Sequence, residues 1–316
     1  MTLETAHAPL TGEVGLDVFV PVHGHPDLTA QCIDALYRNT RTPFHLIIAD
    51  DGDLKKDLTS VFMQGLAARY DNVTLIHKET PPGWKTGNEF FNAAFQHAQT
   101  DYIATVMNSV MVEPDWEVVP LQLLRNQPDV GIIGCKAIYR RDSPKPGLIE
   151  SAGIQMNGFT PIDLGRDMLG HSLCGVNEVF ACQWAMAVLR KQAVVGNLEE
   201  DVFFGHVGWD DIDNCLAIKR KGWKILYCGM SVGFHSPHAT RGDDSLPAAV
   251  KNLYNSHQFY RRNGYWDLFL RTAPPEILKT QVEAMTRGAE KFTGADQKRI
   301  LEDLAMLVGA IKAVGR

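Results

Sequence analysis

Short apolar runs alternate with helical patterns along the first part of the chain. DVFVPV (17–22) and FHLIIAD (44–50) are apolar runs, and the segment between them, PDLTAQCIDALYRNT (26–40), is apolar at helical spacing. This order predicts a strand, a helix and a second strand parallel to the first, because a single connecting helix forms a right-handed crossover. The carboxyl ends of the two strands then lie side by side, where open parallel sheets bind ligands.

The same alternation continues through two further runs, NVTLIHK (72–78) and DYIATVM (101–107), each followed by a segment with helical periodicity. It predicts an α/β fold with a doubly wound, mostly parallel, Rossmann-like nucleotide-binding sheet. Further strands are expected at 130–140, 184–191 and 223–229.

The second half of the chain changes character twice. Residues 141–177 are rich in Gly, Pro and polar side chains, so we expect excursions around a site rather than regular layers. From Leu246 onward the pattern is helical, with breaks at Asn263-Gly264 and Pro274-Pro275. We therefore expect a domain at residues 15–240 and a C-terminal helical extension at residues 241–316.

The composition is that of a soluble globular protein. The 316 residues are 45% hydrophobic and 22% charged, which excludes disordered, collagen-like and coiled-coil chains. A net charge of -6 gives the whole molecule no strong attraction to polyanions. The six cysteines form no CxxC pair, so we expect reduced thiols. No signal-type pattern and no run of roughly 18 apolar residues is found, so we expect a cytoplasmic protein without a membrane span.

The C-terminal extension is mildly basic and interleaves aromatic with basic residues in KNLYNSHQFYRRNGYWDLFLR (251–271). Such a surface could stack nucleic-acid bases or hold a lipid-phosphate or polysaccharide acceptor. The alternative, which we favour, is an amphipathic helix that turns its aromatic side chains inward. The last segment, LEDLAMLVGAIKAVGR (301–316), is apolar at helical spacing and could pair with another subunit in a homo-oligomer.

Two polar turns follow the first two predicted strands. PVHGHPD (21–27) and DDGD (50–53) should face one another across the sheet edge, and a nucleotide base could bind between them with a carboxylate accepting from a ring N–H. The alternative is that the second segment is only an acidic turn after a strand.

Two longer segments resemble a known enzyme family. DVFVPVHGHPDLTAQCIDALYRNTRTPFHLIIADDGD (17–53) is similar to the opening of inverting family 2 glycosyltransferases of the GT-A fold, whose second strand closes with DDGS. VGWDDIDNCLAIKRKGWKILYCGMSVGFH (207–235) is similar to the segment that carries the acidic pair and a later His in that family, and the rhamnosyltransferase-like branch matches best. The resemblance covers residues 16 to 236.

The resemblance implies transfer of a sugar from a nucleotide-diphosphate sugar, UDP-, dTDP- or GDP-linked, to an acceptor hydroxyl with inversion. Such a displacement needs a general base, because the hydroxyl loses its proton as the glycosidic bond forms. Asp211 falls at the family's base position, and Asp210 is its charged neighbour.

The resemblance also assigns donor-binding residues. Asp51 would contact the nucleotide base, and Lys85 would meet the diphosphate as a point charge, with an ordinary loop lysine as the alternative. The other residues implied in donor binding are Pro21, His23, Asp50, Asp53, Asn108 and Ser109.

The metal position departs from the family pattern. The fourth strand normally ends in a carboxylate that binds a divalent ion, whereas this chain has Asn108 and Ser109 there. Neutral oxygen ligands weaken Mg²⁺ or Mn²⁺ binding, although Ser109 and His235 could still hold the ion. A protonated His235 could instead donate to the phosphates, so metal-assisted and metal-free catalysis both remain open.

Trp209 and Trp184 are the candidate walls of the acceptor site, because aromatic faces stack on sugar or base rings. Strand core is the alternative for Trp184. The acceptor itself could be a glycan, a lipid-linked saccharide or a hydroxymethylated pyrimidine in phage-type DNA. A catalytically silent sugar-nucleotide or glycan-binding protein is the rival function, favoured by the missing carboxylate and opposed by the acidic pair.

Overall fold

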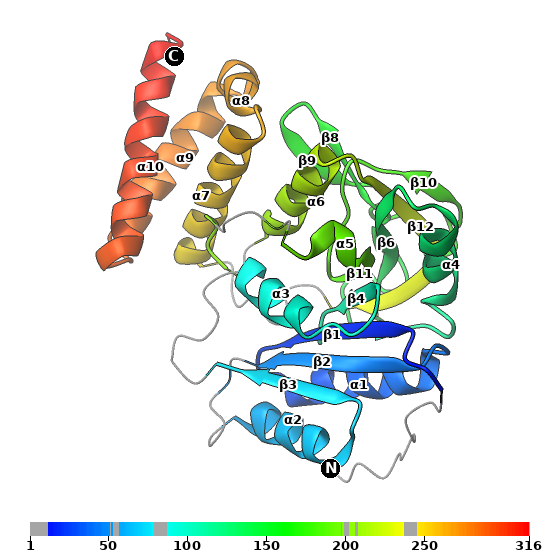
Figure 1. Cartoon of the computed structure of the whole chain (residues 1–316). Coiled ribbons are helices and arrows are strands. Elements are labelled where there is room, and N and C mark those ends of the chain that lie inside the picture. The colour runs from blue at the N-terminus through cyan, green and yellow to red at the C-terminus, as the bar shows by residue number, and fades with distance from the viewer. Residues whose placement is uncertain are drawn as a thin grey trace.

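A computed structural model describes residues 12–50, 52, 57–78, 87–196, 198, 202–205, 208–236 and 245–315. Its centre is a ten-stranded mixed sheet whose main path runs β10-β12-β6-β11-β4-β1-β2-β3. Helices cover both faces of the sheet, and four further helices form a layer at one side (Figure 1). The predicted α/β class and the C-terminal helices are confirmed.

One half of the sheet is parallel, as the alternation predicted. It contains β1 (Leu16–Val22), β2 (Phe44–Asp50), β3 (Val73–His77) and β4 (Tyr102–Val106). β1 pairs in parallel with both β2 and β4, and Val22 lies opposite Asp50, so these strands end at the same edge. The helices of this half are α1 (Pro26–Asn39), α2 (Leu58–Arg69) and α3 (Gly87–Gln96).

The other half is mixed. β11 (Met186–Arg190) lies antiparallel between β4 and β6 (Val130–Tyr139), and β12 (Lys224–His235) runs parallel to β6. The remaining elements here are β5 (Val110–Val112), α4 (Val118–Asn126), β7 (Ile149–Ser151), β8 (Ile154–Asn157), β9 (Thr160–Asp163), β10 (Val176–Glu178), α5 (Lys191–Val194) and α6 (Asp210–Arg220). The region expected to make excursions thus supplies β7 and the β8-β9 hairpin.

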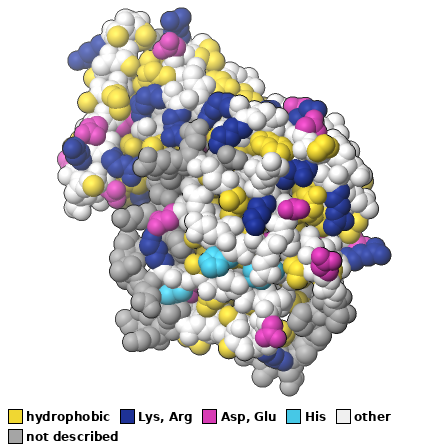
Figure 2. Space-filling view, viewed as in Figure 1, with side chains coloured by type: hydrophobic (Ala, Val, Ile, Leu, Met, Phe, Trp, Pro, Cys, Tyr) yellow, Lys and Arg dark blue, Asp and Glu magenta, His cyan; other side chains and the backbone are white. Residues whose placement is uncertain are grey.

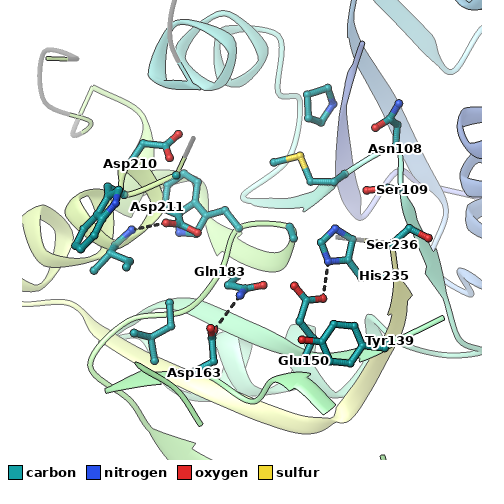
Figure 3. Close-up of a pocket in the computed structure, with 18 of the residues that line it drawn as sticks. Asn108, Ser109, Tyr139, Glu150, Asp163, Gln183, Asp210, Asp211, His235 and Ser236 are labelled. Atoms are coloured by element: carbon teal, nitrogen blue, oxygen red, sulfur yellow. Dashed lines mark hydrogen bonds and ion pairs between the residues drawn. The ribbon is translucent and has the colours of Figure 1, made fainter. Parts of the chain in front are cut away.

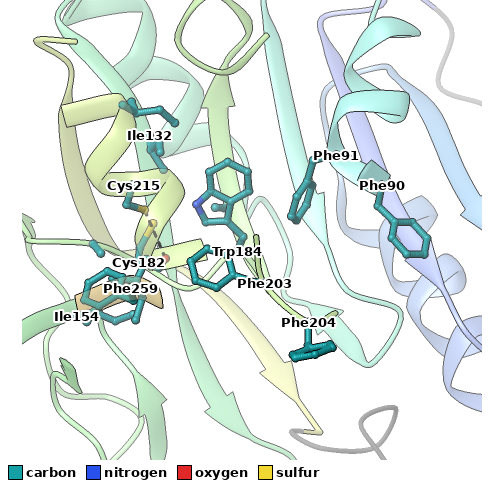
Figure 4. Close-up of a cluster of buried hydrophobic side chains, with 14 of the residues drawn as sticks. Phe90, Phe91, Ile132, Ile154, Cys182, Trp184, Phe203, Phe204, Cys215 and Phe259 are labelled. Carbon is teal, nitrogen blue, oxygen red and sulfur yellow. Dashed lines mark hydrogen bonds between the residues drawn. The ribbon is translucent and has the colours of Figure 1, made fainter. Parts of the chain in front are cut away.

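Two hydrophobic cores lie on the two faces of the sheet, because side chains alternate along each strand. On β1, Val18 and Val20 belong to the core beneath α1, α2 and α4, whereas Phe19 belongs to the core beneath α3, α5 and α6. Phe91 of α3 meets Phe19 edge to face, with ring centroids 5.6 Å apart. The core beneath α3, α5 and α6 contains the aromatic cluster of Figure 4.

The C-terminal layer consists of α7 (Leu246–Arg262), α8 (Trp266–Thr272), α9 (Pro275–Ala289) and α10 (Gly294–Ala313). Tyr254, Phe259 and Tyr260 are at most 7% exposed and share the core of α3 and α6. Their burial confirms the inward-facing interpretation for these aromatic residues. Asp213 of α6 fixes the layer further, since its Oδ1 accepts a hydrogen bond of 2.7 Å from Nδ2 of Asn263. Within the described ranges, no helix is both long and apolar enough to span a bilayer.

Candidate active site

A cavity of about 920 Å³ opens where β1, β4 and β12 end. Its walls come from these strand ends, from β7 and the β8-β9 hairpin, and from the first turn of α6. Histidine side chains are visible on this face of the molecule, with basic and hydrophobic groups beside them (Figure 2). The predicted site residues that line the cavity are Pro21, His23, Asn108, Ser109, Trp184, Trp209, Asp210, Asp211 and His235.

The turn after β4 is built into the surrounding structure. Asn108 is 3% exposed, and its Nδ2 donates to Oγ1 of Thr29 on α1 at 2.9 Å. The carbonyl of Ser109 accepts from the backbone N–H of Ser236 at 3.1 Å, which joins this turn to the end of β12. One side of the Asn108 amide is therefore occupied by a structural bond.

His235 forms an ion pair that sequence reasoning missed. Its Nδ1 lies 2.7 Å from Oε2 of Glu150, and the two side chains are 12% and 6% exposed (Figure 3). The residues are 85 positions apart, and only the pairing of β7 and β12 with β6 brings them together. The sequence pointed to His235 as a possible metal ligand or phosphate donor, and no local pattern linked it to Glu150.

Asp210 and Asp211 begin α6 on the opposite side of the cavity (Figure 3). Oδ1 of Asp211 accepts from the backbone N–H of Ile212 at 2.8 Å, which holds the carboxylate at the helix terminus. The positive end of the helix dipole favours negative charge there. The first turn of α6 thus presents two carboxylates to a cavity whose far side is formed by His235.

The two predicted tryptophans differ in position. Trp209 precedes α6 with φ at 81°, and its Nε1 donates to Oδ1 of Asn252 on α7 at 3.0 Å. Trp184 is 1% exposed and meets Phe91 edge to face at 4.9 Å (Figure 4). Trp184 therefore belongs mainly to the core behind the cavity, whereas Trp209 connects the cavity to the C-terminal layer.

The predicted donor-binding residues also differ in position, and not all of them line the cavity. Asp50 is fully buried and does not line the cavity: its Oδ1 accepts from the Gly52 N–H at 3.1 Å, and its Oδ2 lies 3.4 Å from Nδ1 of His77. Asp51, Asp53 and Lys85 lie outside the described residues.

A polar chain along the β9 wall was not foreseen from the sequence. Oδ1 of Asp163 accepts from Nε2 of Gln183 at 2.9 Å, and its Oδ2 pairs with Arg166. Arg166 in turn donates to the hydroxyl of Tyr139 at 2.8 Å. Burial opposes the charge of Arg166, but the bond to Asp163 outweighs it and raises the Arg166 pKa. Gln183 and Asp163 face the cavity with polar groups that suit the hydroxyls of a sugar (Figure 3).

Few of the described side chains at the cavity could coordinate a cation. Within the ranges that the structure describes, no group of three or more His, Cys, Asp or Glu side chains could hold a metal ion. Ser109 and His235 line the same end of the cavity, but they bring one neutral hydroxyl and one imidazole. A divalent ion here would depend on oxygens of a bound diphosphate as well.

Comparisons with known proteins agree with the fold. Residues 17–146 match the model of the family described as Glycosyl transferase family 2. The chain is also 24% identical over 250 residues to "Uncharacterized protein y4gI" of Sinorhizobium fredii, in an alignment that covers 76% of this chain and 26% of that protein. The chain thus spans about a quarter of the length of this curated relative.

Among solved structures, the chain is similar to the mannosyltransferase PcManGT of Pyrobaculum calidifontis, solved in complex with GDP-Man and Mn²⁺. The TM-score is 0.52 at 14% identity, over 93% of this chain and 85% of that chain. S. aureus TarS 1-349 gives a TM-score of 0.49 at 12% identity, over 93% and 83% of the two chains. The likeness to PcManGT establishes a GT-A type fold. The family match and the fold together support a glycosyltransferase.

Proposed function

We propose that this chain transfers a sugar, with inversion, from a nucleotide-diphosphate sugar to an acceptor hydroxyl. The observation that carries the proposal is the cavity itself, which joins the ends of β1 and β4 to the two carboxylates of α6. Open parallel sheets bind nucleotides at such strand ends, and a carboxylate across the cavity can serve as a base. The rhamnosyltransferase-like branch, which the sequence suggested, is part of this proposal.

The residues divide into donor and acceptor sides. Pro21 and His23 border the nucleotide, and we keep Asp51, Asp53 and Lys85 as donor contacts. Asp50 supports the donor side indirectly, because its Oδ1 accepts from the Gly52 N–H. Asp211 takes the proton from the acceptor hydroxyl as its oxygen bonds to the anomeric carbon. The bond between that carbon and the diphosphate oxygen breaks on the opposite face, which inverts the configuration.

The donor is a UDP-, dTDP- or GDP-linked sugar in this proposal, and PcManGT, with its GDP-Man, offers a parallel. The described residues do not form a metal site on their own, because Asn108 and Ser109 are neutral and no carboxylate stands beside them. We therefore assign no step to Mn²⁺ or Mg²⁺. The question is settled by measuring donor binding with and without the ion.

The acceptor is a glycan, a lipid-linked saccharide or a modified pyrimidine of phage-type DNA. The buried aromatics of α7 weigh against base stacking by Tyr254 and Phe259, since both rings are already covered by protein. We also propose that α10 supports a homo-oligomer, because Leu301 and Met306 on this helix are 48% and 49% exposed.

A silent binding protein is the second candidate, and the neutral Asn108-Ser109 turn favours it. Turnover separates the two functions, because a binding protein retains the donor intact.

Isothermal titration of UDP-, dTDP- and GDP-sugars, with Mn²⁺ and again with EDTA, tests the donor site. We expect one donor to bind at micromolar concentration. Loss of that binding in EDTA would show that the ion is required, and binding of none of the donors under either condition would contradict the proposed function.

A further inference from the structure

Glu150 is a buried acid in the wall of the cavity. It lies at the centre of the short strand β7 and is 5% exposed. A carboxylate at such a depth needs a hydrogen-bonding or charged partner, because burial disfavours its ionised form. Its partner here is Nδ1 of His235 at 2.7 Å.

The geometry fixes which ring nitrogen of His235 carries a proton toward Glu150. A carboxylate can only accept, so Nδ1 is the donor in this bond. The other nitrogen, Nε2, has no hydrogen-bond partner among the residues that the structure describes, and His235 lines the cavity (Figure 3). The pair therefore leaves one ring nitrogen available to a ligand.

Two other buried His-carboxylate pairs in the chain serve as internal comparisons. His45 pairs with Asp17 at 2.8 Å, and its Nε2 is bonded to Oγ1 of Thr74 at 2.8 Å. His257 pairs with Asp303 at 2.7 Å, and its Nε2 meets Oε1 of Gln281 at 3.1 Å.

Both of these comparison pairs use the two ring nitrogens for protein contacts. Neither His45 nor His257 lines the cavity. Among these three hydrogen-bonded pairs, the one made by Glu150 therefore differs in having a second ring nitrogen without a partner among the described residues.

Both members of this pair are held by the same strand. His235 lies opposite Tyr139 of β6, and Ile149 and Ser151, which flank Glu150, lie opposite Ile138 and Ala137. The backbone N–H that follows His235 is bonded to the carbonyl of Ser109. His235 is thus held beside the Asn108-Ser109 turn, where the family pattern has a carboxylate and this chain has none.

We propose that Glu150 is a positioning residue that accepts from Nδ1–H of His235 and so directs Nε2 to the diphosphate of the donor, to which the protonated ring donates its Nε2–H. The Glu150 carboxylate balances the charge of that ring and does not touch the ligand. The inference rests on the proposed function for the identity of the ligand. The orientation of the ring can be measured without any sugar transfer.

The first test is a double-mutant cycle on kcat/KM for the donor. Glu150→Ala should lower kcat/KM about 10- to 100-fold, the usual cost of removing a partner that orients a ligand-binding His. Because both changes act on one group, Glu150→Ala combined with His235→Ala should be no worse than His235→Ala alone. Glu150→Gln, which keeps an oxygen for Nδ1, should recover part of the loss.

The matched control is Asp17→Asn, which weakens the closed pair with His45. It should lower the melting temperature and leave kcat/KM of the folded protein unchanged. Additive effects of Glu150→Ala and His235→Ala would overturn the proposal. So would a Glu150→Ala variant that changes the melting temperature alone.

The second test is independent of catalysis. Long-range ¹H–¹⁵N spectra of ¹⁵N-histidine-labelled protein at about pH 8.5, where an ordinary imidazole is neutral, report the tautomer of His235. The wild type should show the proton on Nδ1, and Glu150→Ala should shift it toward Nε2. A wild-type His235 with no proton on Nδ1 would overturn the proposal. The predicted tautomer in a protein that transfers no sugar would refute the proposed function alone.

Discussion

The His45-Asp17 pair in the parallel half of the sheet and the His235-Glu150 pair at the cavity have the same chemistry and different surroundings. Their N–O distances are 2.8 Å and 2.7 Å, and all four side chains are largely buried. Asp17 also accepts from the backbone N–H groups of Gln99 and Thr100, so its pair closes a junction between β1 and the start of β4.

The contrast between the two pairs shows that burial and pairing of an acid do not identify a functional site. The difference lies in what the second ring nitrogen meets, which is Thr74 for His45 and the cavity for His235. Changes at the closed His45-Asp17 pair should therefore alter stability, and changes at the residues that line the cavity should alter turnover.

The largest expected effect is that of Asp211→Asn. Removing the general base should lower the rate of sugar transfer roughly 10²- to 10⁴-fold. The amide oxygen still accepts from the Ile212 N–H, so donor affinity and melting temperature should stay close to those of the wild type. Single-turnover kinetics and donor titration measure the two quantities.

Asp213→Asn is the matched control on the same helix. Asp213 is 1% exposed and bonded to Asn263 and Arg262, away from the cavity lining. This variant should lose stability and keep its transfer rate. Normal turnover by Asp211→Asn would remove Asp211 from the mechanism.

Asp17→Asn tests how much the closed His45-Asp17 pair contributes to stability. The two carboxylate oxygens accept from four donor groups of Gln99, Thr100 and His45, and an amide has only one oxygen to accept them, so we expect a loss of roughly 2 to 4 kcal/mol in the free energy of unfolding. Urea denaturation measures this loss. An unchanged midpoint would show that the closed pair contributes little.

The pH dependence of the same variant gives a separate check. Burial opposes the charge of Asp17, but the hydrogen bonds from His45, Gln99 and Thr100 outweigh it and lower its pKa below the ordinary 3.8. The contribution of Asp17 to stability is then complete above about pH 4 and declines as the pH falls through the folded-state pKa. Melting temperatures of wild type and Asp17→Asn should converge below about pH 4. A difference that does not shrink as the pH falls below about 4 would contradict the lowered pKa.

His235→Ala should weaken donor binding roughly 10- to 100-fold, because a hydrogen bond to a charged group contributes about 1.5 to 3 kcal/mol. His45→Ala is the corresponding change in the closed pair, and it should reduce stability with no change in donor affinity. Titration of the donor into both variants measures the difference in affinity. Unchanged affinity in His235→Ala would leave this residue a structural role only.

The smallest effect is expected for Trp209→Phe. It removes the bond from Nε1 to Asn252, which should cost about 0.5 to 1.5 kcal/mol of stability, and it retains a ring at the cavity edge. Asn252→Ala removes the same bond from the other side and should cost a similar amount. If Trp209→Phe raised the acceptor KM while Asn252→Ala did not, the indole would contact the acceptor directly.

The sequence predicted the first parallel strands well, because β1, β2 and the helix between them have distinct periodicities. The resemblance named Asp211 and His235 as site residues, and the structure shows that both line one cavity, while their roles stay predictions. The direction of β11 could not be predicted, because a buried strand has the same apolar pattern whether its neighbours are parallel or antiparallel.

Two features of the site depended on tertiary structure. The Glu150-His235 contact spans 85 residues and arises only when β7 and β12 both pair with β6. Asp50 follows a strand exactly as a ligand-binding acid would, but its carboxylate is enclosed and lies beside His77 of β3. No local pattern distinguishes an acid that faces a cavity from one that faces a neighbouring strand.

The most direct test of the account is to measure, on the same preparations, the melting temperature and the single-turnover transfer rate of Asp17→Asn and Asp211→Asn. We predict a lower melting temperature with a wild-type rate for Asp17→Asn, and a wild-type melting temperature with almost no transfer for Asp211→Asn. A normal rate in Asp211→Asn, or a lost rate in fully folded Asp17→Asn, would contradict the assignment of catalysis to the cavity and of stability to the closed His45-Asp17 pair.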